Sequence, residues 1–229
     1  MIFVLGYSRA NDFFSHQYDN ITLFVDNGQQ RIKNANCPMY QTSRNIGCAG
    51  GWNLIASIAF DYMGLDKICI TQDDISLPEY VFLEALKQYE EGTILGIIQP
   101  FFEFSAFIIS SSVYKKVGKF DESFQYVYGE DADYKQRCGL LGVPVKSLYW
   151  PNSYNKSAST LDDPSVNKLQ DNLAYLKRKW GASINRNMDA QLDNQPPYEY
   201  FRPTTAMWGS VGSDSEYRLF LQSRVLHGV

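Results

Sequence analysis

Histidine and cysteine, which often bind metals or catalyse reactions, are scarce in this sequence. Of 229 residues, two are histidines, and neither has a partner motif: His16 and His227. Four are cysteines, widely spaced and without a CxxC pair: Cys37, Cys48, Cys69 and Cys138. Zinc sites and disulfide frameworks need clustered ligands or regular cysteine spacing. The pattern instead favours reduced thiols and predicts a reducing, cytoplasmic location.

Excess positive charge and long apolar runs are also absent. The formal net charge is −4, with 21 basic and 25 acidic residues. Because phosphate backbones are bound by clustered Lys and Arg, we expect no nucleic-acid partner. The apolar stretch 94–112 is interrupted by Gln99, Pro100 and Glu103, and residues 1–5 are too short for a signal sequence. We therefore expect no transmembrane segment.

Apolar strand-like runs alternate with helical patterns over most of the chain. Strands are predicted at 1–5, 21–26, 67–72, 94–99, 105–110 and 143–150, and helices at 47–64, 76–92, from 129 onward and at 165–180. Such alternation predicts an α/β fold with a mostly parallel, Rossmann-like sheet flanked by helices. Ligands of these sheets lie at the carboxyl ends of the strands. We expect one domain over 1–184 and an irregular extension, 185–229, that packs on it or forms a lid.

Two adjacent carboxylates, Asp73 and Asp74, follow the strand KICI. Ser76 and Glu79 have the spacing of a capping box for the next helix, which would leave both aspartates free of that task. Adjacent carboxylates repel, and a divalent cation relieves the repulsion. The pattern therefore indicates either a site for Mn²⁺ or Mg²⁺, completed by substrate phosphates, or a plain polar turn.

The stretch GEDADYKQR places three carboxylates at a predicted helix start. Asp133 and Arg137 have the spacing of an ion pair, which predicts a structural role for Asp133. Glu130 falls on the apolar line of the same helix, and Asp131 lies beside it. Desolvation next to a like charge raises a carboxyl pKa toward the range of a general base. From spacing alone, Glu130 and Asp131 are either catalytic or a favourable acidic first turn.

Other polar residues near the strand ends have ordinary explanations. Asp26 precedes Asn27–Gly28 and suits a turn. Arg9 and Arg44 are single cations in glycine-containing or polar segments and suit a surface position.

Five segments in order resemble the family 2 glycosyltransferases of the GT-A fold. They are TLFVDNG, SRNIGCAGGWN, CITQDDISLP, SAFIISSSVYKKVGKFDESFQYVYGEDADYKQR and AYLKRKWG. The resemblance covers residues 1 to about 181, and VGKFDESF followed by GEDADYKQR is its most specific part. It implies an inverting glycosyltransferase of the hexosyltransferase type. Such an enzyme moves a sugar from a nucleotide diphosphate sugar, UDP by family habit, to a hydroxyl of a glycan or other acceptor.

The resemblance also implies roles for individual residues. Asp131 matches the general base, with Glu130 its neighbour near the acceptor, and Asp74 matches the carboxylate that binds Mn²⁺ or Mg²⁺. The residues that match the nucleotide and donor site are Gly6, Tyr7, Arg9, Asp26, Arg44, Asn45, Asn53, Gln72 and Asp73. Gln72 replaces the first Asp of the DxD motif, which leaves Asp73 as the expected contact to the sugar or ribose. Many members also supply a metal-binding histidine in the region that matches YWPNSYNKS, which has none.

Two other classes of function remain open. A sugar-phosphate nucleotidyltransferase would need a glycine-rich basic loop after the first strand, where GYSRAND offers one Gly and one Arg. A non-catalytic module that binds nucleotide sugars or carbohydrates would be compatible with Gln72 and the missing histidine. The presence of both Asp74 and Asp131 favours the transferase.

Overall fold

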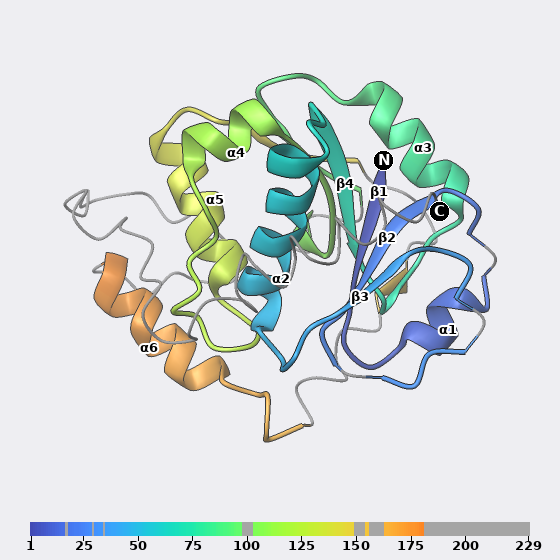
Figure 1. Ribbon diagram of the computed structural model, residues 1–229. Coiled ribbons are helices and arrows are strands. Elements are labelled where there is room, and N and C mark those ends of the chain that lie inside the picture. The colour runs from blue at the N-terminus through green and yellow to red at the C-terminus, as the bar shows by residue number, and fades with distance from the viewer. Residues whose placement is uncertain are drawn as a thin grey trace.

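A single seven-stranded sheet forms the centre of the molecule (Figure 1). The structure, a computed structural model, describes residues 1–16, 18–28, 30–33, 35–97, 103–148, 154–155 and 163–180. In spatial order the strands are β3 (Met39–Gln41), β2 (Ile21–Asp26), β1 (Ile2–Gly6), β4 (Lys67–Gln72), β7 (Ala106–Ser110), β6 (Ile94–Gly96) and β8 (Val145–Ser147). β7 is antiparallel to both its neighbours, and the other paired strands are parallel. The predicted α/β fold with a mostly parallel sheet is confirmed.

Helices cover both faces of the sheet. In chain order they are α1 (Ala10–Phe14), α2 (Gly47–Ala56), the π-helix η1 (Ser57–Tyr62), α3 (Glu79–Gln88), the 3-10 turn η2 (Glu103–Ser105), α4 (Ser111–Val117), α5 (Glu130–Leu140) and α6 (Leu169–Trp180). α2, α4 and α5 pack on one face, and α1 and α3 pack on the other (Figure 1). A short ribbon joins β5 (Ile75–Ser76) to β9 (Tyr154–Asn155).

Aromatic side chains fill the core on both faces. On the α2 and α5 side, the rings of Phe120 and Tyr134 stack with centroids 3.8 Å apart, and Trp52 packs against Phe120 at 4.9 Å. On the other side, Phe13 stacks on Tyr18 at 4.3 Å. Large rings bury much apolar area each, so these clusters stabilise the attachment of the helices to the sheet.

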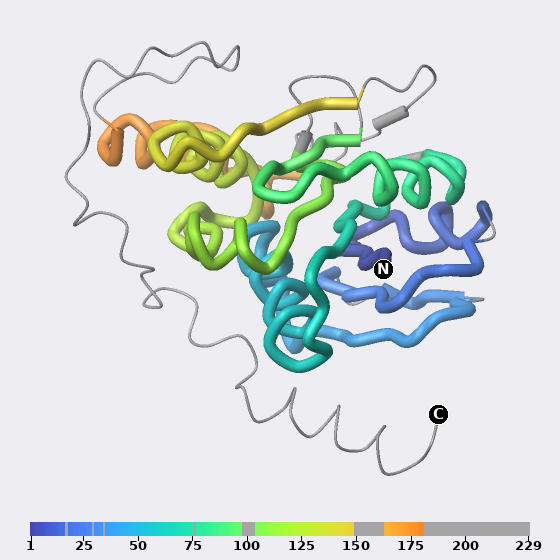
Figure 2. The backbone as a smooth tube through the Cα atoms, turned by 90° about the horizontal axis from the view of Figure 1, so that it is seen from above, coloured from blue at the N-terminus to red at the C-terminus, as the bar shows by residue number. Residues whose placement is uncertain are grey.

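α6 lies against α5 on the side away from the sheet (Figures 1 and 2). Its buried residues Leu176 and Trp180 form a small apolar cluster with Phe124. Residues 185–229, predicted to wrap or lid the domain, lie outside the described part of the chain, as do the ends of the predicted strands at 98–99 and 149–150. Within the described residues, no helix combines the length and apolarity needed to cross a membrane.

Three predicted helix boundaries differ from the structure. The capping box is wrong, because Ser76 belongs to β5 and α3 begins after Pro78 without a side-chain cap. Glu79 instead accepts hydrogen bonds from the backbone and side-chain nitrogens of Asn20, at 2.6 and 2.9 Å. The helix predicted over 47–64 changes to a π-helix after Ala56. The helix predicted from 165 begins at Leu169, after a turn.

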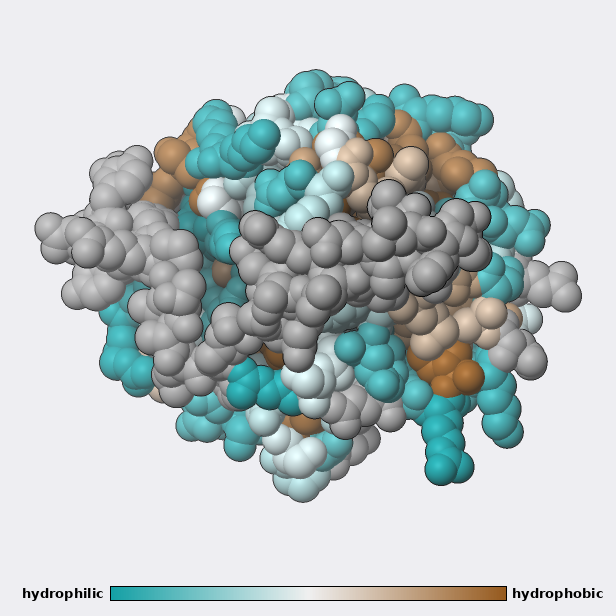
Figure 3. Space-filling model, in the orientation of Figure 1, coloured by the Kyte–Doolittle hydropathy of each residue, from teal (hydrophilic) through white to brown (hydrophobic). Residues whose placement is uncertain are grey.

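Polar residues cover much of the face seen in Figure 3, and apolar ones gather at the upper right, where α3 lies. Two α3 side chains contribute to the apolar surface, Tyr80 at 60% and Leu83 at 37% exposure. Isolated apolar exposure of this kind is normal for a globular domain.

Candidate functional site

The carboxyl ends of three parallel strands meet at one edge of the sheet. Gly6 of β1 pairs with Asp26 of β2, and Leu5 of β1 pairs with Gln72 of β4. Because the strands end in register, the segments that follow them are neighbours, as the sequence predicts. Seven of the twelve predicted site residues lie at these strand ends or directly after them: Gly6, Tyr7, Arg9, Asp26, Gln72, Asp73 and Asp74.

Asp73 holds the loop that follows β1. One of its carboxylate oxygens, Oδ2, accepts three backbone N–H groups: Tyr7 at 3.0 Å, Ser8 at 3.2 Å and Arg9 at 2.7 Å. Burial raises the pKa of Asp73 to about 6, although these donors oppose the rise. This oxygen is thus engaged by the protein itself, and the predicted contact of Asp73 to a sugar or ribose stays a prediction.

Asp26 organises the loop after β2 in the way its turn interpretation predicts. Its carboxylate accepts backbone N–H groups from Gly28 at 3.1 Å and Gln30 at 2.8 Å. The loop packs tightly on the one after β1, because a Cβ on Gly28 would lie 1.6 Å from the carbonyl oxygen of Tyr7. Only glycine permits this approach. These hydrogen bonds do not test the predicted contact of Asp26 to a nucleotide, which stays a prediction.

Asp74 carries a buried oxygen that has no protein partner. No hydrogen-bond donor among the described residues reaches its Oδ1. Burial, and then the neighbouring charge of Asp73, raise the pKa of Asp74 to about 7, while Arg9 opposes the rise. A buried oxygen without a donor is an expected ligand for a cation. Among the described residues, no group of three or more His, Cys, Asp or Glu has the geometry of a metal site.

Cys48 links the end of β4 to the beginning of α5. It lies in the first turn of α2, where its sulfur accepts a hydrogen bond from Gln72 Nε2 at 3.6 Å. Its thiol also hydrogen-bonds the carboxyl of Glu130. Burial, followed by the charges of Glu130, Asp74 and Asp131, raises the thiol pKa well above its usual value. Asp74 from one predicted acidic pair, and Glu130 and Asp131 from the other, therefore lie near this thiol.

Glu130 and Asp131 begin α5 and differ in exposure. Glu130 is 4% exposed, which confirms its predicted place on the buried face, and its Oε2 has no hydrogen-bond partner among the described residues. Burial, and then the charge of Asp131, raise the pKa of Glu130 well above its usual value. Asp131 is half-buried and accepts the backbone N–H of Ala132 at 2.7 Å.

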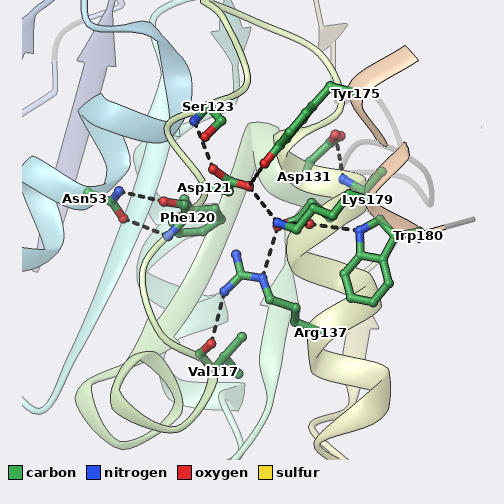
Figure 4. A network of polar contacts seen from close by, with 12 residues as sticks. Asn53, Val117, Phe120, Asp121, Ser123, Asp131, Arg137, Tyr175, Lys179 and Trp180 are labelled. Carbon is green, nitrogen blue, oxygen red and sulfur yellow. Dashed lines mark hydrogen bonds and ion pairs between the residues drawn. The ribbon is translucent and has the colours of Figure 1, made fainter. Parts of the chain in front are cut away.

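A buried ion network fixes the helix that carries this pair (Figure 4). The predicted pair of Asp133 and Arg137 is confirmed, with Oδ2 and Nε 3.0 Å apart. Lys179 of α6 lies 2.6 Å from both Asp133 and Asp121. Sequence reasoning gave no role to Asp121 or Lys179. Their separation by 58 positions concealed the contact, although both lie in segments on which the family resemblance rests.

The remaining predicted donor residues lie at or near the first turns of α2. Asn53 uses its whole amide inside the protein: Nδ2 donates to the Phe120 carbonyl and to Glu122, and Oδ1 accepts from Phe120 N–H and the Tyr114 hydroxyl. These contacts hold Asn53 inside the domain, and its predicted place in the donor site stays a prediction. Asn45 joins two loops, since its Oδ1 accepts from Asn27 and from the N–H of Gly47. Arg44 is exposed.

No protein-family model and no curated protein matches this sequence. One similar solved structure is a mutant of a Drosophila β-1,4-galactosyltransferase 7 in complex with manganese, UDP-Gal and xylobiose, with 13% identity and a TM-score of 0.47 over 84% of this chain and 83% of that chain. Another is the inositol-1-phosphate CTP transferase from T. maritima, with 13% identity and a TM-score of 0.41 over 77% of this chain and 96% of that chain. Similarities this distant say nothing of the activity of the chain.

Proposed function

We propose that this protein is an inverting glycosyltransferase. It moves a sugar from a nucleotide diphosphate sugar, with UDP as the expected nucleotide, to a hydroxyl of a glycan or other acceptor. The observation that carries the proposal is the meeting of Gln72 and Asp74 with Glu130 and Asp131 around Cys48. Acidic groups with different environments, gathered at the carboxyl edge of a parallel sheet, have the character of an active site.

Asp131 is the general base in this reaction. It takes the proton of the acceptor hydroxyl while the acceptor oxygen bonds to the anomeric carbon, and the bond from that carbon to the diphosphate breaks with its electron pair. Attack from the face opposite the leaving group inverts the anomeric carbon. The raised pKa of Glu130 keeps its carboxyl protonated more readily, so that Asp131 can carry the negative charge of the pair.

The residues present fit a divalent cation held through Asp74. Its buried Oδ1 lacks a donor, and Mg²⁺ and Mn²⁺ commonly use one or two protein carboxylates with phosphate oxygens and water. When bound, such a cation supplies positive charge to the leaving diphosphate. Asp73 keeps the loop after β1 in place beside it through the three backbone N–H groups that it accepts.

The test is the release of nucleoside diphosphate. Purified protein is incubated with panels of nucleotide sugars and glycan acceptors with Mn²⁺, and the nucleotide product is identified by chromatography. We expect nucleoside diphosphate in amounts that depend on both donor and acceptor. Pyrophosphate released from a nucleoside triphosphate and a sugar phosphate would instead show the nucleotidyltransferase. Donor binding without turnover across the panels would show the non-catalytic module.

A further inference from the structure

The segment that enters α5 has a strained backbone. Tyr126 and Tyr128 have φ angles of 54° and 78°. These lie in the left-handed region, which residues other than Gly, Asn and Asp rarely adopt. Gly129 follows with φ 98° and packs on Phe124, where a Cβ would lie 3.0 Å from the ring. Two tyrosines with such φ angles within three positions are stable only where surrounding contacts hold the backbone in this conformation. Glu130 and Asp131 follow at once.

Three of the hydrogen bonds that hold this segment come from one buried amide on α6. Asn172 is 2% exposed. Its Oδ1 accepts the N–H of Gln125 at 3.0 Å, and its Nδ2 donates to the carbonyls of Gln125 at 2.8 Å and Val127 at 2.9 Å. On the other side of the loop, the N–H of Cys48 donates to the carbonyl of Tyr126 at 2.7 Å. The loop is therefore clamped between the first turn of α2 and the first turn of α6.

The clamp also sets the first turn of α5. The Cβ atom of Asn172 lies 3.7 Å from where a Cβ of Gly129 would be, and the carbonyl of Gly129 accepts the N–H of Asp133 at 2.9 Å. If the clamp is released, the two tyrosines can relax toward ordinary φ values, and the direction of the chain into α5 changes. A shift of about 1 Å in a catalytic group is enough to slow a reaction by about a hundredfold.

We propose that Asn172 is a positioning residue for sugar transfer, which holds the loop 125–129 in its strained form and thereby fixes where Asp131 meets the acceptor hydroxyl. This proposal rests on the proposed function. Asn172 acts on the acceptor side of the site, because its hydrogen bonds go to the loop that leads to Asp131. The loop after β1 is held instead by Asp73.

Asn172→Ala tests the proposal, because it should lower turnover without weakening donor binding. We expect kcat to fall about tenfold to a hundredfold while the donor Kd changes less than about twofold. Asp171→Ala changes an exposed neighbour on the same helix and should leave kcat unchanged. Val81→Ala in α3, on the opposite face of the sheet, is the control for lost stability and should keep kcat at a temperature where both variants are folded.

Relief of strain provides the second arm. Glycine adopts left-handed φ values without steric cost, so Tyr128→Gly combined with Asn172→Ala should recover part of the lost kcat. General destabilisation would not be repaired in this way. If Asn172→Ala does not fold, Asn172→Asp replaces it, because it keeps the acceptor for Gln125 and loses both donors, and the same split is expected.

The proposal is overturned if kcat is unchanged in Asn172→Ala, or if donor affinity falls as much as kcat. Failure of the proposed function has a different result, since the unmodified protein would then release no nucleoside diphosphate from any donor and acceptor pair.

Discussion

Four carboxylates near one sheet edge have four different surroundings. Asp73 accepts three backbone N–H groups, and Asp74 has an oxygen without a donor. Glu130 is buried beside a thiol, and Asp131 keeps contact with solvent. Because their surroundings differ, like residues can divide the tasks of loop support, cation binding and proton transfer.

Asp131→Asn removes the proposed base with little change of shape. We expect transfer to fall at least about a hundredfold, because an amide cannot accept the acceptor proton. Donor affinity should stay nearly the same, since the base acts on the acceptor. Product release measured beside calorimetric donor binding tests this expectation, and equal losses of turnover and donor affinity would contradict the assignment.

Asp74→Ala removes the proposed cation ligand. In the unmodified protein we expect Mn²⁺ to strengthen donor binding and EDTA to reverse the effect. The variant should bind the donor weakly and equally with and without Mn²⁺. Asp61→Ala, which changes an exposed carboxylate of η1, is the control. Donor binding that is indifferent to both EDTA and the Asp74 change would refute the metal role.

Local spacing predicted some of these environments and missed others. The i,i+4 spacing predicted the Asp133–Arg137 pair, and helical periodicity predicted the burial of Glu130. Both predictions depend only on residues within one helix. The backbone partners of Asp73 lie 64 to 66 positions away, and backbone groups leave no mark in the sequence. The three bonds of Asn172 are concealed for the same reason.

The attachment of α6 to α5 depends on a buried set of charges that balance. Asp121 and Asp133 are matched by Arg137 and Lys179, and all four are buried. Tyr175 and Trp180 of α6 also donate to these carboxylates, each at 2.9 Å. Loss of one member of a buried pair leaves an uncompensated charge, so the network makes α5 and α6 depend on each other.

Asp121→Asn should weaken the fold in a pH-dependent way. Burial alone would raise the pKa of Asp121, but Lys179 and the donors from Ser123 and Tyr175 outweigh it and hold the pKa below its usual 3.8. The native state therefore binds this proton less tightly than the unfolded chain. The resulting stability is fully present above pH 3.8 and is lost as pH falls through the native pKa.

At pH 7 we expect Asp121→Asn to lower the free energy of unfolding by about 2–4 kcal/mol. The difference from the unmodified protein should shrink in acid, as the native Asp121 becomes protonated. Urea titrations at several pH values measure both effects, with Asp171→Asn as the exposed control on α6. A stability difference that does not depend on pH would show that the charge of Asp121 is not what stabilises the contact.

The elements were predictable where apolar periodicity is strong. Strands β1, β2 and β4 lie within a residue of their predicted bounds, because continuous apolar runs identify buried strands. Within the seven-stranded sheet, β7 was not predicted to run against its neighbours, since a run such as AFIIS carries no sign of its direction. The pairing of β9 with β5 depends on contacts between distant segments and also left no local pattern.

α6 is part of the folded domain. Two of its buried residues, Lys179 and Trp180, attach it to α5 and to the loop before α5. The predicted boundary near residue 184 lies outside the described residues and stays a prediction. α6 supplies the countercharge for two buried carboxylates and the clamp of the strained loop.

Two truncations separate these roles. A chain of residues 1–184 keeps both clusters of the core and all four members of the ion network, so we expect cooperative thermal unfolding close to that of the full chain. A chain of residues 1–168 loses Asn172 and Lys179 and exposes the apolar surface of Phe124. It leaves Asp121 without a cation, so we expect it to lose cooperative unfolding or to aggregate. Circular dichroism melts of the two chains test this, and a stable, cooperative 1–168 would show that the domain ends before α6.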